Sequence, residues 1–144
     1  MDFVARQLFL TAKALRSELD TRLGEAGSSV PFWLVLLHTT RVQGLSQREL
    51  AENMRVEAPT LTRHLDRMEA EGLIERHRDA DDRRVTRLHL TAAGRRQYRR
   101  LLRVVEELDS ELAALLTAEE AAVLDRALAR IIDHVEDTDA RDVG

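Results

Sequence analysis

The segment RHRDADDRRVTRLHLT, residues 76–91, gathers five arginines around three aspartates. Arginine presents a planar, permanently charged fork that binds phosphate oxygens and guanine edges through paired hydrogen bonds. The aspartates and a histidine could instead bind a cation, in a metal site made of His77, Asp79, Asp81 and Asp82. The neighbouring arginines and the single acidic cluster argue against such a site, so we predict no metal. An exposed ion pair that contributes little free energy is the alternative to anion binding.

The charge of the chain is unevenly distributed around a net value of -4. Residues 1–40 contain four basic and four acidic residues, residues 41–103 fifteen and ten, and residues 104–144 three and twelve. A localised basic region of this kind favours binding to a polyanion more than the net charge does. A solvated charged face has the same composition and is the alternative.

The composition indicates a soluble globular protein, with 144 residues of which 44% are hydrophobic and 33% charged. This length fits one domain. The chain has no cysteine, which excludes disulfides and thiol oxidation. The first residues, MDFVARQLFLTAKALR, are typical of neither a signal peptide nor a membrane span, so we expect a cytoplasmic protein.

The sequence predicts that the elements which hold the charged segment in place are mostly helices. The first predicted helix carries an apolar stripe at spacings of three and four, formed by Leu8, Ala12, Leu15, Leu19 and Leu23. A second, buried helix lies in SSVPFWLVLLHTTRVQG, which begins with serine and ends at Gly44. Ser46 and Glu49 form a capping box that starts a third helix. After a turn at MRVEAP, a fourth helix buries Leu61, Leu65 and Met68 and ends at Gly72.

Two strands and two helices follow. LIERHR and VTRLHL predict a hairpin, since Leu88 and Leu90 alternate with polar residues. Thr91 caps a long helix whose apolar seam is Leu101, Val105, Leu108, Leu112 and Leu115. A capping box of Thr117 and Glu120 starts the last helix, with a stripe of Leu124, Leu128, Ile131 and Val135. We expect a loose tail over residues 137–144.

This order predicts a mainly α fold, in which a helix-turn-helix is followed by a two-stranded β-wing. The stretch LSQRELAENMRVEAPTLTRHLDRMEAEGLIERHRDADDRRVTRLHLTAAG resembles the DNA-binding core of the MarR family of bacterial transcriptional regulators. The resemblance lies in the frame TLTRHLDRMEAEGLIERH, the pair Asp82-x-Arg84, and LT-x-x-G at Leu90, Thr91 and Gly94.

The resemblance implies one MarR-like domain over residues 1–144. Its winged-helix DNA-binding core would span residues 30–90, and residues 1–27 and 92–136 would be N- and C-terminal dimerisation helices. The implied function is a sequence-specific regulator of transcription, a ligand-responsive repressor that binds a pseudo-palindromic double-stranded DNA operator as a homodimer.

DNA contacts are predicted on the fourth helix and at the start of the third. The resemblance places them at Thr62, Arg63 and Arg67, and helix geometry adds Thr60 and His64 to the outer face. Ser46 and Gln47 are candidates for phosphate contacts, because free backbone N–H groups gather at a helix N-terminus.

The wing is predicted to contribute Asp82, Arg83 and Arg84. An arginine at a wing tip suits the negative potential of the minor groove. The resemblance implies that Asp82 holds the side chain of Arg84, which lowers the entropy lost on docking. The chain departs from the family in two places: Arg55 occupies the turn where a small residue is frequent, and Glu57, a poor N-cap, precedes the recognition helix.

An effector site is implied at the second helix. Members of the family respond to small aromatic or anionic molecules, and the resemblance places Trp33, His38 and Arg41 at that crevice. A planar acid could pack there while Arg41 or His38 meets its carboxylate. A filled core without a pocket is the alternative, in which Trp33 is a core residue.

Other classes of function fit less well. The six glycines are scattered, and the chain lacks G-x-S-x-G and H-E-x-x-H, so we predict neither an enzyme nor a cofactor. Only five aromatic residues argue against stacking on single strands or RNA. The second hypothesis is a winged-helix protein-interaction regulator without direct DNA binding. The arginines at positions 63, 67 and 84 argue against it.

Overall fold

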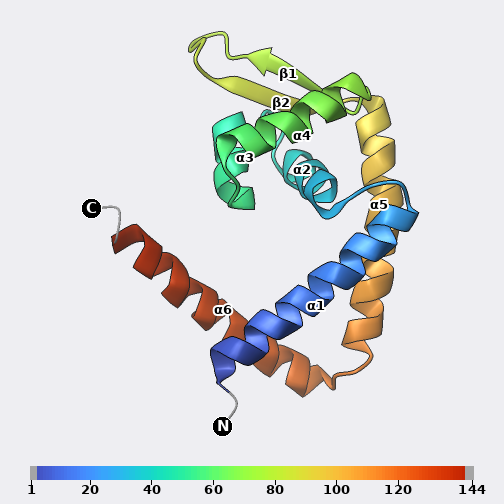
Figure 1. The fold of residues 1–144 in the computed structure, drawn as a ribbon, viewed down its shortest axis with the longest axis vertical. Helices are drawn as coiled ribbons and strands as arrows, with labels where there is room; N and C mark the ends of the chain where they lie inside the picture. Colours follow the sequence, from blue (N-terminus) through green and yellow to red (C-terminus); the bar gives the residue numbers. More distant parts are fainter. Residues whose placement is uncertain (1–2, 142–144) are drawn as a thin grey trace. The chain divides into compact units, whose positions relative to one another are not determined.

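The computed structural model describes residues 3–141 and is mainly helical (Figure 1). Its elements are α1 (Val4–Glu25), α2 (Val30–Arg41), α3 (Gln47–Met54), α4 (Ala58–Ala70), β1 (Ile74–Arg78), β2 (Thr86–Leu90), α5 (Ala92–Ala113) and α6 (Ala118–Arg141). The predicted winged helix-turn-helix with a two-stranded wing is confirmed. The described residues form two compact units, residues 3–105 and 106–141. Among the described residues no helix is both long and apolar enough to cross a membrane.

The first two helices are joined by a short turn. Gly27 has a φ of 76°, in the left-handed region that glycine adopts readily, and Ser28 N donates to Leu23 O at 2.8 Å. Ser29 then caps α2, because its hydroxyl accepts from Phe32 N at 3.4 Å. The predicted serine start of this helix is confirmed.

The helix-turn-helix consists of α3 and α4. Ser46 Oγ accepts from Glu49 N at 3.1 Å, and Ser46 N donates to Glu49 Oε2 at 2.9 Å, which confirms the predicted capping box. The chain turns at Arg55, whose φ of 52° is left-handed, a conformation unfavourable for a residue with a Cβ. Glu57 makes no side-chain cap for α4.

The hairpin is antiparallel, with Ile74 opposite Leu90 and Arg78 opposite Thr86. Its inner face buries Ile74, Leu88 and Leu90. Leu88 N also donates to Leu45 O at 2.9 Å, beside an isolated bridge between Ser46 and Arg87. These bonds fix the base of the wing to the residues that start α3.

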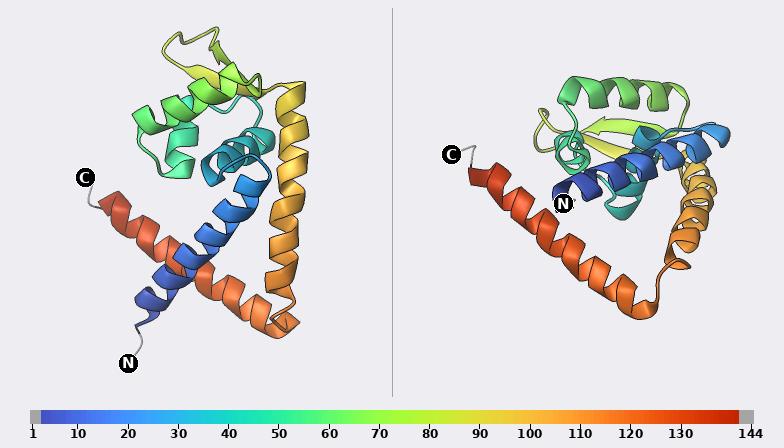
Figure 2. Two further views of the ribbon diagram at one scale, coloured as in Figure 1. Left: turned by 45° about the vertical axis from the view of Figure 1, so that its right-hand side comes forward. Right: turned by 60° about the horizontal axis from the view of Figure 1, so that its bottom comes forward.

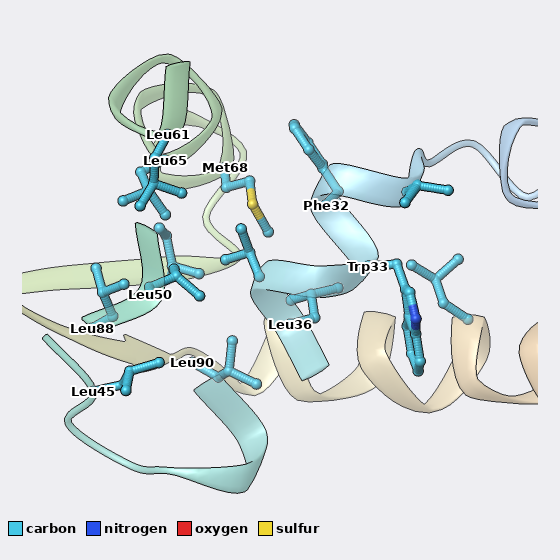
Figure 3. Close-up of a cluster of buried hydrophobic side chains, with 14 of the residues drawn as sticks. Phe32, Trp33, Leu36, Leu45, Leu50, Leu61, Leu65, Met68, Leu88 and Leu90 are labelled. Carbon is cyan, nitrogen blue, oxygen red and sulfur yellow. The ribbon is translucent and has the colours of Figure 1, made fainter. Parts of the chain in front are cut away.

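The core of the first unit surrounds α2, which contacts α1, α3, α4 and β2 (Figure 1, Figure 2). Figure 3 shows Leu36 of α2 among side chains from α3, α4 and the hairpin. The fully buried members include Leu36, Leu50, Leu61, Leu65, Met68 and Leu88. Each buried leucine contributes roughly 1.5–3 kcal/mol relative to an exposed one, so this core fixes the orientation of α4.

The start of α5 is packed tightly against the residues that follow α4. Thr91 Oγ1 accepts from Gly94 N at 3.0 Å, which confirms Thr91 as the cap, and it donates to Gly72 O at 2.6 Å. A Cβ added at Gly94 would lie 2.0 Å from Leu73 O. Only glycine fits at this close approach.

In the second unit, a further capping box starts α6: Thr117 N donates to Glu120 Oε2 at 2.8 Å, and Thr117 Oγ1 accepts from Glu120 N at 3.2 Å. The helix continues to Arg141, so the predicted loose tail over 137–144 is wrong for residues 137–141. No glycine or proline interrupts these residues, and each added residue brings one backbone hydrogen bond. Residues 142–144 lie outside the described residues.

Candidate nucleic-acid interface

The inner face of α4 is formed by Leu61, Leu65 and Met68, which are fully buried as predicted. Arg63 and Arg67 are exposed, whereas Thr60, Thr62 and His64 are half-buried. The helix therefore presents its two arginines to solvent on a rigid support.

The starts of α3 and α4 are joined by two of the predicted site residues. Gln47 Nε2 donates to Thr62 Oγ1 at 3.1 Å, and Thr62 Oγ1 donates in turn to Ala58 O at 3.0 Å. Because its amide is held in this way, Gln47 has a defined position beside α4.

Ser46 was predicted to contact a phosphate, but its hydrogen-bonding groups cap α3 instead. It is buried, and the capping box uses both its hydroxyl and its backbone N–H. The hydrogen bond from the Ser46 N–H is also the main reason why the pKa of Glu49 is lowered. At this helix start Gln47 is therefore a better candidate than Ser46 for a contact with an anion.

His64 and Arg67 both contact Phe32 of α2. The imidazole meets the phenyl ring edge-on, with centroids 6.1 Å apart and planes at 84°, and Arg67 Cζ lies 5.3 Å from the ring centroid. Burial, followed by the charges of Arg63 and Arg67, lowers the pKa of His64. This shift favours the neutral form of the imidazole.

At the wing, Asp82 and Arg84 form the predicted pair. Arg84 Nε donates to Asp82 Oδ1 at 3.0 Å and Nη2 donates to Oδ2 at 3.1 Å, while the Arg84 backbone N–H also binds Oδ1 at 3.0 Å. These bonds lower the pKa of Asp82, first through the Arg84 side chain. The Arg84 side chain is nevertheless 90% exposed, so it is held in place and open to a partner.

Asp79 organises the rest of the wing, a role that its sequence position did not reveal. Its Oδ1 accepts from Asp81 N at 2.8 Å and from Asp82 N at 3.0 Å, and its Oδ2 binds the Arg87 guanidinium. These bonds, with that of Arg87 the largest, lower the pKa of Asp79 to about 2. Asp79 thus serves as an internal acceptor for the loop.

Arg78 is a second residue that the sequence did not single out. Its Nη1 donates to Arg83 O at 2.7 Å across the hairpin. A small cavity of about 260 Å³ is lined by Gln47, Arg76, Arg78 and Thr86. Since Arg76 is paired with Asp66 at 2.6 Å and Glu69 at 2.9 Å, Arg78 is the better candidate there for a contact with an anion. The alternation Ile74, Arg76, Arg78 along β1 would have placed these side chains on one face.

A larger groove of about 920 Å³ runs between the helix-turn-helix and the wing. Its lining includes Gln47, Arg48, Glu52, Arg55, Asp82 and Arg84. The groove brings two of the three predicted wing residues, Asp82 and Arg84, to one surface with Gln47.

The three residues of the predicted effector site differ in their surroundings. Trp33 is buried and its ring lies parallel to that of Tyr98, with centroids 5.5 Å apart and planes at 1°. His38 is half-buried, and burial followed by the charge of Arg41 lowers its pKa, while Arg41 is exposed. The indole face is therefore already covered by Tyr98, as a core residue would be.

A sequence model described as MarR family matches residues 31–86, from the first turn of α2 to the start of β2. The crystal structure of the transcriptional regulator PA3341 is 34% identical, with a TM-score of 0.83, and the similarity covers 94% of this chain and 99% of that one. The chain belongs to the MarR family.

Two further relatives of this MarR-family chain extend the comparison. It is 27% identical over 128 residues to an uncharacterized HTH-type transcriptional regulator of Bacillus subtilis, YdgJ, covering 89% of this chain and 76% of the relative. A mutant of MarR from E. coli, crystallised in complex with operator DNA, is 26% identical with a TM-score of 0.80. That similarity covers 89% of this chain and 92% of the E. coli chain.

Proposed function

We propose that this MarR-family transcriptional regulator binds double-stranded DNA through α4 and the β1–β2 wing. The observation that carries the proposal is the Arg84 guanidinium, which Asp82 holds by two hydrogen bonds while it remains open to solvent. A guanidinium that is already ordered loses less entropy when it enters the minor groove. The similarity to the E. coli MarR crystallised with operator DNA supports the same reading.

The other contacts divide between the major groove and the backbone. Arg63, exposed on α4, suits the edge of a guanine or a phosphate in the major groove. Gln47, Arg78 and Arg83 lie where phosphates flanking the groove can be bound, since the first two line one basic cavity. Thr60 and Thr62 are within the first turns of α4, the part of a recognition helix that faces base edges.

We infer that the regulator acts as a homodimer on a pseudo-palindromic operator. Large apolar side chains are exposed on α6: Val123, Leu124, Leu128, Ile131, Ile132 and Val135. Helix α1 likewise exposes Val4, Phe9, Leu10 and Leu15. Apolar stripes of this size are covered by a partner in most soluble proteins, and a second copy would also supply the second half-site reader.

We further propose that this regulator represses transcription and that a small ligand relieves the repression. A small aromatic or anionic effector could reach the end of α2, where Arg41 is exposed and His38 is half-buried. Because Tyr98 covers Trp33, such a ligand would have to displace Tyr98 before it stacked on the indole. Ligand and operator would then weaken each other's binding by the same factor. A regulator of this kind acts in the cytoplasm.

Selection of duplexes from a random DNA pool, followed by gel-shift titration, tests the proposal. A DNA-binding regulator enriches a sequence with two related half-sites, and its affinity falls steeply with salt. If the protein enriches no sequence and retards no duplex at micromolar concentration, the alternative of a protein-interaction regulator without DNA binding replaces the proposal.

A further inference from the structure

Phe32 belongs to α2, yet its ring lies against the recognition helix. It is 9% exposed and contacts two α4 side chains, His64 by its edge and Arg67 across its face. Figure 3 shows Phe32 and Trp33 leaving α2 on different sides, with Trp33 beside α5. The Phe32 ring therefore packs against α4 and the Trp33 ring against α5.

Arg67 is held by two groups at once. Its Cζ lies 5.3 Å from the Phe32 centroid, within the range of a cation–π interaction, and its Nε pairs with Glu71 Oε1 at 3.2 Å. The side chain is still 73% exposed. The ring and the carboxylate thus restrict a long, flexible side chain and leave most of it available to a partner.

His64 makes this arrangement compatible with the surrounding charge. It lies between Arg63 and Arg67 in sequence and contacts the same ring as Arg67. Burial and these two arginines lower the pKa of His64, which favours the neutral imidazole. A neutral side chain at this place packs on Phe32 without repelling Arg67.

We propose that Phe32 is a positioning residue for DNA recognition, whose ring holds the Arg67 guanidinium in the orientation that meets the DNA. The inference rests on the proposed function, because it concerns how the same interface reads a duplex. It places a determinant of recognition outside the recognition helix, on α2, where no contact with DNA is expected.

A double-mutant cycle tests the proposal, with the best duplex from the random-pool selection as the probe. Phe32→Leu keeps an apolar side chain and removes the ring face, and we expect it to weaken binding about three-fold to ten-fold. In an Arg67→Ala background the same change should have no further effect. Equal losses in both backgrounds would show that Phe32 acts on the fold alone and would overturn the proposal.

Replacement of Phe32 by trifluorophenylalanine tests the same role if Phe32→Leu folds poorly. Fluorine keeps the shape of the ring but weakens the negative potential of its face, so affinity should fall while the unfolding midpoint stays close to that of the parent. Unchanged affinity with the fluorinated ring would contradict the proposal. If the parent protein binds no duplex, the proposed function itself is wrong. If the parent binds but the losses of affinity from Phe32→Leu and Arg67→Ala are additive, only the role of Phe32 is wrong.

Discussion

Asp79, the first residue of the wing loop, and Arg87, in β2, form an ion pair that joins the loop to the residues just before α3. Arg87 Nε binds Asp79 Oδ2, and Arg87 Nη1 donates to Gly44 O at 2.9 Å. The same carboxylate accepts the backbone N–H groups of Asp81 and Asp82. One side chain therefore sets both the loop conformation and its attachment.

The first prediction concerns pH. Asp79 has a folded pKa of about 2, below the roughly 3.9 of an unfolded aspartate, so its contribution is fully present above about pH 4. It is lost as the pH falls from about 4 to about 2. Urea unfolding of the parent and of Asp79→Asn should give a stability difference that is constant from pH 7 to pH 5 and shrinks below pH 4. A difference that does not change across this range would show that the charge of Asp79 is unimportant.

The second prediction concerns the wing tip. Arg84→Ala should weaken binding of the selected duplex about ten-fold or more and leave the unfolding free energy unchanged, since the side chain is exposed. Asp82→Ala should have the same effect in a milder form, because the guanidinium remains but is no longer held. Fluorescence anisotropy at fixed salt measures both variants. Arg99→Ala, an exposed arginine of α5, is the control and should bind like the parent.

The third prediction concerns self-association. Leu128→Asp or Ile131→Asp introduces a carboxylate into the exposed apolar stripe of α6 and should dissociate the proposed homodimer. Sedimentation at micromolar protein concentration distinguishes the mass of a monomer from that of a dimer. Arg126→Asp places the same charge at another position on the helix and should leave the dimer intact. A monomeric parent would refute the inferred assembly.

The fourth prediction concerns the start of the recognition helix. Glu57 provides no side-chain cap for α4, whereas a serine hydroxyl could accept an N–H of the first turn. Glu57→Ser should therefore raise the free energy of unfolding by about 1 kcal/mol, measured by urea unfolding. Glu57→Ala, which also removes the charge but adds no acceptor, should not. Equal effects of the two substitutions would assign the gain to charge removal.

The sequence predicts what depends on neighbours along the chain. The capping boxes of Ser46 with Glu49 and of Thr117 with Glu120 span three residues, so residue type and spacing are sufficient to identify them. The pairing of Asp82 with Arg84 is also local, and the resemblance to the family pointed to it.

What the sequence did not reveal depends on elements that meet in space. The bond of Arg78 to the Arg83 carbonyl requires the register of the hairpin, and the contact of Phe32 with Arg67 requires the packing of α2 on α4. Ser46 looked available for a phosphate until the structure placed its hydroxyl and N–H in the cap. The continuation of α6 to Arg141 escaped prediction because charged residues without an apolar stripe suggest a tail, although they do not prevent a helix.

The close approach at Gly94 affects how loss-of-function variants of this regulator are interpreted. A methyl group there would meet Leu73 O at 2.0 Å, so Gly94→Ala must displace the start of α5 or the turn after α4. In a genetic screen such a variant would look like a failure of regulation, although its primary defect would be a low yield of folded protein. Soluble abundance, measured beside reporter output, separates alleles of this kind from those that alter DNA recognition itself.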